Sequence, residues 1–157
     1  MRLTDILKES HVLMPLKSDE RDDAIRALID ILDQNQLLSD KEKAFQAVLE
    51  REKIMTTGVG NGIAIPHCKD SSCPNFAVAL GLHPKGVDFH SLDKKKAKIV
   101  FLLVGPENNP GMHIKLLSRI SRLMSNEELR EQIISCKKPE EVIEIIQEEE
   151  EYYFDLD

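Results

Sequence analysis

The sequence predicts an α/β fold in a single domain, for two reasons. A chain of 157 residues is long enough to bury one hydrophobic core without disulfide or metal support. Hydrophobic patterns typical of helices also alternate with patterns typical of strands, and residues 99–104 are apolar throughout, as in a strand buried on both faces. Strands interleaved with helices indicate an α/β architecture.

Two amphipathic helices are predicted in the first third of the chain. The first covers residues 18–34, with Ser18 as its N-cap and apolar side chains at i, i+3, i+4 and i+7. These side chains are Ile25, Leu28, Ile29 and Leu32. The second helix has Ser39 as its predicted N-cap and ends at Arg51 or Glu52, because Gly58 breaks the pattern soon afterwards.

Strands are predicted in the middle of the chain, and helices are predicted in its last third. The predicted strands are residues 63–66, 76–82 and 99–104, with an edge segment at 86–89. A loop rich in Pro, Asn and Gly follows at residues 106–111. Three helices are predicted after it, at residues 112–124, 126–135 with Asn126 as N-cap, and 139–148.

Composition and charge exclude several classes of protein. The net charge of −7 argues against nucleic-acid binding, and no apolar run approaches the roughly 20 residues of a membrane span. The first residues lack the apolar segment of a signal peptide, so we expect a cytoplasmic chain without direct membrane insertion. Cys68, Cys73 and Cys136 are expected to be reduced thiols, because their odd number does not suit a disulfide framework. The acidic residues 147–157 are expected to form a solvated, frayed end.

The segment GVGNG places Gly58, Gly60 and Gly62 on alternate positions. This spacing is neither GxGxxG nor GxxxxGK followed by Ser or Thr, and the chain continues as a strand instead of opening a helix. A nucleotide-binding loop is therefore not indicated. Two functions stay open: a tight turn, or a backbone that approaches a charged group closely and donates its amide N–H groups to it.

His67 comes next and follows Pro66 directly. The proline ring restricts the backbone, so the imidazole is expected at a strand end with little freedom. It can be a structural histidine, a metal ligand, or a nucleophile that accepts a group and passes it on. A metal site would use His67, Cys68, Cys73 and His83, but neighbouring residues 67 and 68 on a strand point to opposite faces. Cys68 is either an alternative nucleophile or a small buried thiol.

His113 lies in the first turn of a predicted helix. Leu116, Leu117 and Ile120 follow at +3, +4 and +7, so His113 shares the inward face and lies where a site can border the core. A core histidine is the alternative. The other side of this helix carries a basic stripe, either a solvated face or a contact for an acidic partner, made of Lys115, Arg119 and Arg122.

Two segments together resemble a known family. They are LEREKIMTTGVGNGIAIPHCK at 49–69 and MHIKLLSRISRLMSNEELREQI at 112–133, with LTDIL near the start and GVDF in the middle as further points of likeness. In this order they resemble the IIA component of the fructose, mannitol and nitrogen-regulatory branch of the bacterial phosphotransferase system. The resemblance implies one α/β domain over residues 1–150, with a mixed β-sheet flanked by helices on both sides, and an acidic C-terminal tail at 151–157.

The same resemblance implies roles for individual residues. His67 would accept a phosphoryl group through Nε2, His113 would be the second active-site histidine, and Arg51 would hold the phosphoryl group. Glu52 and Thr56 occupy further motif positions. The residues expected to bind phosphate are Thr57, Gly58, Gly60 and Gly62. Phosphoryl transfer requires a positioned nucleophile and stabilised negative charge, so we expect neither a cofactor nor a metal. Met55 and Cys68 stand where the family commonly has glycine, and they are expected to add bulk near the site.

The resemblance also implies partners. The expected donor is a small histidine phosphocarrier protein, HPr-like or NPr-like. The expected recipients are a IIB component or regulatory target proteins. The likeness favours the nitrogen-regulatory type of phosphoryl carrier. A sugar-specific IIA component of fructose or mannitol transport and a binding module that is not phosphorylated are the alternatives.

Overall fold

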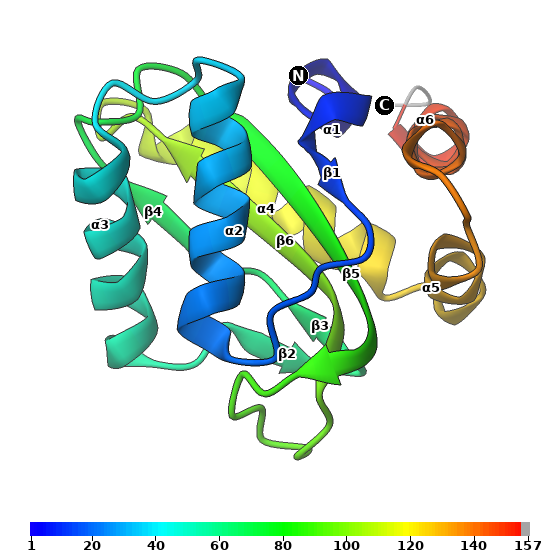
Figure 1. Cartoon of the computed structure of the whole chain (residues 1–157). Helices are drawn as coiled ribbons and strands as arrows, with labels where there is room; N and C mark the ends of the chain where they lie inside the picture. The colour runs from blue at the N-terminus through cyan, green and yellow to red at the C-terminus, as the bar shows by residue number, and fades with distance from the viewer. Residues whose placement is uncertain (155–157) are drawn as a thin grey trace.

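The computed structural model describes residues 1–154 and has three layers, with helices on both faces of a mixed six-stranded sheet (Figure 1). The helices are α1 Leu3–Ile6, α2 Arg21–Gln34, α3 Lys41–Ile54, α4 Pro110–Met124, α5 Glu127–Ile134 and α6 Pro139–Phe154, and Glu9–His11 form a short 3-10 helix. The strands are β1 Val12–Leu13, β2 Gly58–Gly60, β3 Ile63–Ala64, β4 His67–Lys69, β5 Ala77–Val87 and β6 Ala97–Gly105. The predicted α/β fold with a mixed sheet flanked by helices on both sides is confirmed.

The antiparallel pair β5 and β6 forms the centre of the sheet. β1 runs parallel to β5, whereas β3 and β4 both run parallel to β6 on its other edge. β3 pairs with the start of β6 at Ile99, and β4 pairs with its end, where His67 lies opposite Leu103. The sheet therefore holds the glycine segment at one end of β6 and His67 at the other (Figure 1).

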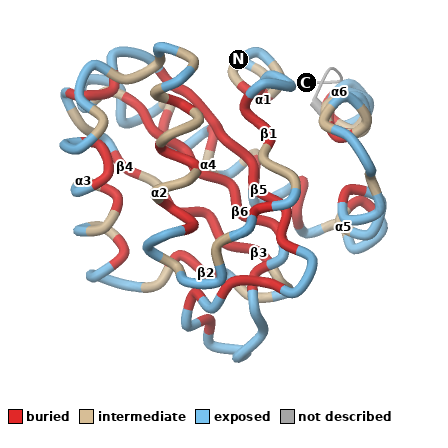
Figure 2. The backbone as a smooth tube through the Cα atoms, viewed as in Figure 1, coloured by how far each residue is buried: buried red, intermediate tan, exposed pale blue. Residues whose placement is uncertain are grey.

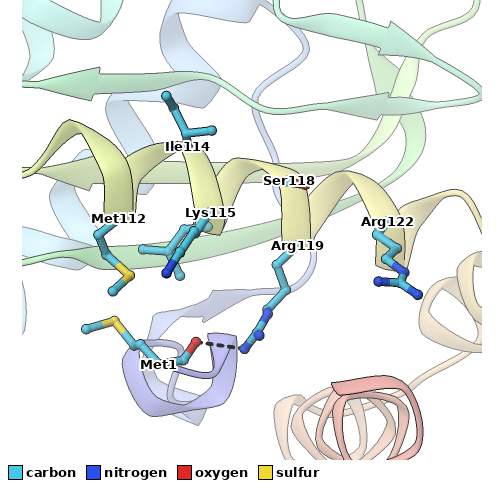
Figure 3. A pocket seen from close by; sticks show the side chains of 8 residues that line it. Met1, Met112, Ile114, Lys115, Ser118, Arg119 and Arg122 are labelled. Carbon is cyan, nitrogen blue, oxygen red and sulfur yellow. Dashed lines mark hydrogen bonds between the residues drawn. The ribbon is translucent and has the colours of Figure 1, made fainter. Parts of the chain in front are cut away.

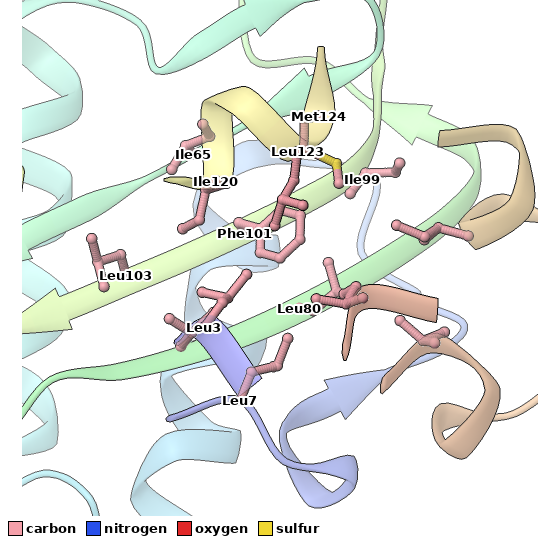
Figure 4. Packing of buried hydrophobic residues seen from close by; sticks show 14 of the residues in the cluster. Leu3, Leu7, Ile65, Leu80, Ile99, Phe101, Leu103, Ile120, Leu123 and Met124 are labelled. Carbon is pink, nitrogen blue, oxygen red and sulfur yellow. The ribbon is translucent and has the colours of Figure 1, made fainter. Parts of the chain in front are cut away.

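Alternating side chains of β6 supply both hydrophobic cores. Ile99, Phe101 and Leu103 pack with α1, α4, α5 and α6 on one face (Figure 4), and the residues between them pack with α2 and α3 on the other. Every residue from Ile99 to Gly105 is buried, and buried backbone follows β5 and β6 through the middle of the molecule (Figure 2). The prediction that residues 99–104 are buried on both faces is confirmed.

The helix starts differ from the predictions. α2 begins at Arg21 with Glu20 as N-cap, so the predicted cap at Ser18 is wrong. α3 is capped by Asp40, whose carboxylate accepts from the Lys43 N–H, while the Ser39 hydroxyl donates to the carbonyl of Ser72. Ser39 is therefore used to fix a loop rather than a helix end.

The C-terminal helix continues beyond the predicted end at residue 148. α6 extends to Phe154, and the Glu150 side chain is fully buried. Its carboxylate accepts from the Leu3 N–H at 2.6 Å, and from the N–H and hydroxyl of Thr4 at 3.0 and 2.9 Å. The prediction that residues 147–157 form a solvated end holds for Tyr152, which is exposed, but it is wrong for Glu150. Residues 155–157 of that segment lie outside the described part of the chain. The division at residue 150 stays a prediction.

Candidate active site

His67 and His113 face each other at the end of β6. His67 begins β4, and His113 comes from the first turn of α4, so residues far apart in sequence meet on one face of the sheet. Their ring centroids are 5.5 Å apart and their planes are inclined by 53°. Phe76 packs on the other side of His113, with ring centroids 6.4 Å apart. The structure thus brings together the two histidines that the sequence analysis selected.

A hydrogen bond determines which nitrogen of His67 carries the proton. Nδ1 lies 2.8 Å from the carbonyl oxygen of Ile65. A carbonyl oxygen only accepts, so Nδ1 must donate, and the lone pair of the neutral ring is on Nε2. Burial lowers the pKa of His67 below its ordinary value of 6.5, the bond to Ile65 opposes this, and the charge of Arg51 lowers the pKa further. At neutral pH, Nε2 is an unprotonated nucleophile.

His113 is almost fully buried, and it differs from His67 in its hydrogen bonding. Among residues 1–154, neither of its ring nitrogens has a hydrogen-bond partner. Burial, with smaller contributions from His67 and Lys69, lowers the pKa of His113 to about 4. The ring is therefore neutral at physiological pH and has one N–H to donate. A buried polar group without a partner costs roughly 1–3 kcal/mol, so an acceptor placed beside this ring would be favoured.

Arg51 contributes positive charge from the last turn of α3. One of its guanidinium nitrogens donates to the carbonyl of Met55 at 3.0 Å, which holds the side chain at the helix end. Its charge lowers the pKa of His67, so the guanidinium acts on the nucleophile electrostatically. Met55 is one of the two residues expected to add bulk near the site, and its side chain is mostly exposed to solvent.

Glu52 is buried and fixes the segment that follows α3. Its carboxylate accepts from the N–H of Thr57 at 2.7 Å and from the Thr57 hydroxyl at 2.5 Å. Both donors of Thr57 are therefore already engaged. The Thr56 hydroxyl similarly donates to the carbonyl of Phe89. These bonds give the two threonines structural partners, and the structure does not direct the Thr57 donors toward His67.

The glycines lie at the other end of β6 from His67. Gly58 pairs with Ala64 in β3, and the carbonyl of Gly62 accepts from the N–H groups of Lys98 and Ile99. Gly58 and Gly60 are in register with Val100 and Ile99 of β6, whereas His67 pairs with Leu103, so the separation along the strand is about 10–13 Å. Gly60 and Gly62 have φ angles of 91° and 79°, as a tight turn requires. The structure supports the turn and does not bring these glycines to His67.

The Cys68 side chain points away from the two histidines into the core below α3. Its sulfur lies 4.0 Å from the carbonyl of Ala44, so its bulk does not enter the space around His67. A hydrogen bond with Cys73 and burial raise the pKa of Cys68, which keeps the thiol protonated and a poor nucleophile. The four proposed metal ligands do not converge, because His83 binds Asp19 at 2.8 Å at the other end of the sheet.

A match to a family model shows which family this chain belongs to. Residues 5–149 match the model described as "Phosphoenolpyruvate-dependent sugar phosphotransferase system, EIIA 2". The chain belongs to this family. Among the residues that the structure describes, no helix is long and apolar enough to cross a membrane.

Relatives of this EIIA 2 chain are named either as components of sugar-specific PTS systems or as nitrogen regulatory proteins. It is 36% identical over 146 residues to the PTS system fructose-specific EIIABC component of Bacillus subtilis, covering 93% of this chain but only 23% of that protein. It is 31% identical over 150 residues to a nitrogen regulatory protein of Bradyrhizobium diazoefficiens, covering 93% and 95% of the two chains. The crystal structure of Nitrogen Regulatory Protein IIA-Ntr from Neisseria meningitidis superposes with a TM-score of 0.85 at 27% identity, covering 91% and 97%.

Lys69 of this EIIA 2 chain is a further candidate site residue, which sequence reasoning missed. Its charge lowers the pKa of both His67 and His113, which places it close enough to act on both rings. The available signal was the period of two in a strand, because residues 67 and 69 share a face. Lys69 adds a second positive charge beside that of Arg51.

A groove of ≈ 460 Å³ runs along α4 of the EIIA 2 chain (Figure 3). Its lining includes Met1, Met112, Ile114, Lys115, Ser118, Arg119 and Arg122. Arg119 donates to the carbonyl of Met1 at 2.7 Å and lies 3.8 Å from the Glu150 carboxylate. The solvated-face alternative for the basic stripe is therefore wrong for Arg119, which joins α4 to both ends of the described chain.

Proposed function

We propose that this chain carries a phosphoryl group on Nε2 of His67, accepted from a small histidine phosphocarrier protein in the cytoplasm. The observation that carries this proposal is the hydrogen bond from Nδ1 to the Ile65 carbonyl, because it leaves the Nε2 lone pair free beside His113. Membership of the EIIA 2 family supports phosphoryl transfer as the chemistry.

The transfer step exchanges one N–P bond for another. The Nε2 lone pair of His67 forms a bond to phosphorus as the donor's N–P bond breaks, and that electron pair returns to the donor imidazole. The Nδ1 proton stays in its bond to the Ile65 carbonyl. The transition state is loose and spreads negative charge over three oxygens, so the protein acts mainly by positioning and by electrostatics. Neither a general base nor a metal enters this step.

Three groups are proposed to stabilise that negative charge. Arg51 and Lys69 supply positive charge near His67. The neutral His113 ring supplies an N–H that lacks a partner among the described residues. A phosphoryl group on His67 would provide the missing acceptor, and its negative charge would raise the pKa of His113.

The nitrogen-regulatory type is the favoured role. It is supported by the 31% identity that spans 95% of the Bradyrhizobium protein and by the likeness to the Neisseria structure. In this role, the state of His67 would be read by regulatory target proteins. Delivery of phosphate to a fructose-specific IIB component is the second candidate, favoured by the 36% identity to the Bacillus protein.

The first test is phosphorylation in vitro. The chain is incubated with labelled phosphoenolpyruvate, enzyme I and the phosphocarrier, and the label is mapped under alkaline conditions, where phosphohistidine survives. We expect one label on His67 and none on a His67→Ala protein, while His90→Ala serves as an exposed-histidine control that keeps the label. Label remaining on His67→Ala would exclude the assignment.

A second experiment separates the two roles. The phosphorylated chain is mixed with a fructose-specific IIB component, and transfer of label is followed over time. Bare, phosphorylated and His67→Ala proteins are also used to capture regulatory partners. Binding that differs between bare and phosphorylated forms, without transfer to IIB, supports the regulatory role, whereas rapid transfer to IIB supports sugar transport.

A further inference from the structure

A second cavity lies at the opposite end of the sheet from His67. It has a volume of ≈ 570 Å³ and is formed by the β5–β6 hairpin, the turn between β2 and β3, and one side of α5. Its lining residues are Asn61, Gly62, Lys85, Lys95, Lys96, Lys98, Glu127, Arg130, Glu131 and Ile134. Gly62 binds the start of β6 at Lys98 and Ile99, whereas His67 pairs with its end at Leu103, so this cavity is separate from the histidine pair.

The cavity concentrates positive charge on an acidic protein. Four lysines and Arg130 line it against two glutamates, although the whole chain has a net charge of −7. Among residues 1–154, none of the salt bridges involves these four lysines. Like charges held together repel one another, so an anion bound among them would relieve that repulsion.

Specific contacts fix the backbone that carries the lysines. Gly86 has φ +93°, and a Cβ added there would lie 2.5 Å from Cβ of Lys96, so the two sides of the hairpin approach closely. The Asp93 carboxylate accepts from the N–H groups of Asn61 and Lys95 at 2.8 and 3.0 Å, which ties the hairpin to the β2–β3 turn. The lysine side of the cavity is thus built on a backbone with defined contacts.

The two sides of the cavity differ in chemistry. The hairpin side presents ammonium groups, which bind phosphate as point charges. The α5 side presents Glu127 and Glu131, one helical turn apart, with Arg130 beside them. Carboxylate oxygens only accept hydrogen bonds, so hydroxyl groups are suitable partners for this side. The volume lies within the range of about 300–1,000 Å³ typical of small-molecule sites.

We propose that this cavity binds a small sugar that carries two phosphate groups, with the phosphates on the lysine side and the hydroxyls on Glu127 and Glu131. A nucleic acid does not fit the charge of the chain, because its length would extend the polyanion over an acidic surface. A bare polyphosphate would leave the two glutamates facing an anion. This site does not depend on phosphorylation of His67, and it gives the protein a second ligand.

The test measures binding of defined probes by calorimetry near 0.15 M salt. The probes are fructose 1,6-bisphosphate, inorganic pyrophosphate and unphosphorylated fructose. We expect saturable binding of the bisphosphate, weaker binding of pyrophosphate and none of fructose, with the same affinities in a His67→Ala protein. Amide NMR shifts are expected at Gly62, Gly86 and Lys96. Shifts centred on His67 and His113, or the absence of bisphosphate binding at millimolar concentration, would overturn the proposal.

Two double variants test the two sides separately. Lys96→Gln with Lys98→Gln is expected to raise the bisphosphate Kd at least tenfold, whereas the matched control, Lys17→Gln with Lys138→Gln, removes two exposed charges elsewhere and should change it less than twofold. Glu127→Ala with Glu131→Ala is expected to lower the preference for bisphosphate over pyrophosphate at least threefold. The proposed site would be contradicted if the two double lysine variants lost bisphosphate affinity equally. It would also be contradicted if the double glutamate variant kept the same preference for bisphosphate over pyrophosphate.

Discussion

At the scale of single residues, two histidines with depressed pKa values differ in one hydrogen bond. His67 has one nitrogen fixed to the Ile65 carbonyl, and His113 has both nitrogens buried without a partner among the described residues. The first arrangement produces a nucleophile with a defined tautomer, and the second produces a donor that lacks its acceptor. Roles for the two rings follow from their surroundings rather than from their residue type.

The acceptance of phosphate should depend on the protonation of His67. Burial lowers its pKa below 6.5, so the lone pair on Nε2 is available throughout the neutral range and is lost only when the pH falls through the lowered pKa. NMR titration of the His67 ring should give a midpoint below 6.5, with Nδ1 protonated above it. Single-turnover acceptance should fall at acid pH with the same midpoint. A midpoint at or above 6.5 would contradict this account.

Removal of His113 or Arg51 should slow transfer without abolishing it. Each is proposed to contribute about one charge-assisted hydrogen bond, roughly 1.5–3 kcal/mol, so His113→Ala and Arg51→Ala should each slow transfer about ten- to hundredfold. Lys53→Ala removes an exposed charge next to Arg51's helix turn and serves as the control. In wild type, phosphorylation should raise the pKa of His113 from about 4. Normal transfer by a folded His113→Ala protein would assign this histidine to the core alone.

At the scale of elements, the position of His113 depends on how α4 begins. Asn109 caps this helix by accepting from the Met112 N–H at 3.2 Å, and Pro110 occupies its first position. The cap lies one turn before His113, so the first turn of α4 determines where the ring is held. Helix stability and site geometry are therefore linked at this end of the helix.

The cap of α4 should affect both stability and transfer. Asn109→Ala should cost about 1 kcal/mol of unfolding free energy and should also slow phosphoryl transfer severalfold, because a frayed first turn displaces His113. Asn126 is the control, since it caps α5 by accepting from the Leu129 N–H at the same distance of 3.2 Å, and its amide also donates to Glu149 at 3.2 Å. Asn126→Ala should lower stability at least as much, because it also removes the bond to Glu149, and should leave transfer unchanged. Equal transfer rates in the two variants, measured where both are folded, would contradict a role for the cap.

The elements that the sequence revealed are those long enough to show a period. The apolar spacing of α2 and the unbroken apolar run of β6 were sufficient for prediction. β1, β2 and β4 have two or three residues each, which is too short for a periodic signal. The α3 cap was misplaced by one residue because Ser39 and Asp40 are both good N-caps, and only the tertiary contact of Ser39 distinguishes them.

The sequence predicted the candidate site only in part. His67 was marked by Pro66, and His113 by its place on an inward helix face, but their meeting was indicated only by the family resemblance. The glycines next to His67 in sequence are separated from it in space, because Ile65 and Pro66 break the strand between β3 and β4. Sequence proximity therefore suggested a phosphate loop, whereas pairing with β6 places the glycines at the other end of the sheet.

At the scale of the whole molecule, one buried carboxylate joins the two ends of the described chain. Glu150 on α6 accepts from the first residues of α1, and Arg119 on α4 lies 3.8 Å from it while donating to the carbonyl of Met1. Three helices on one face of the sheet thus meet at a single side chain. In sequence this residue is one of four consecutive glutamates, and nothing local distinguishes it from its solvated neighbours.

Loss of this carboxylate should destabilise the whole fold. Glu150→Ala removes the acceptor of the buried Leu3 N–H and of the partly buried Thr4 N–H, together with one carboxylate near Arg119, so we expect a loss of about 3–5 kcal/mol in unfolding free energy. Glu150→Gln keeps one acceptor oxygen and should lose less. Glu148→Ala, at an exposed position two residues earlier, should change stability by under about 0.5 kcal/mol. Urea unfolding measures all three, and amide exchange should accelerate first in α1. Equal stability of the Glu150→Ala and Glu148→Ala proteins would show that the two chain ends are not held by this residue.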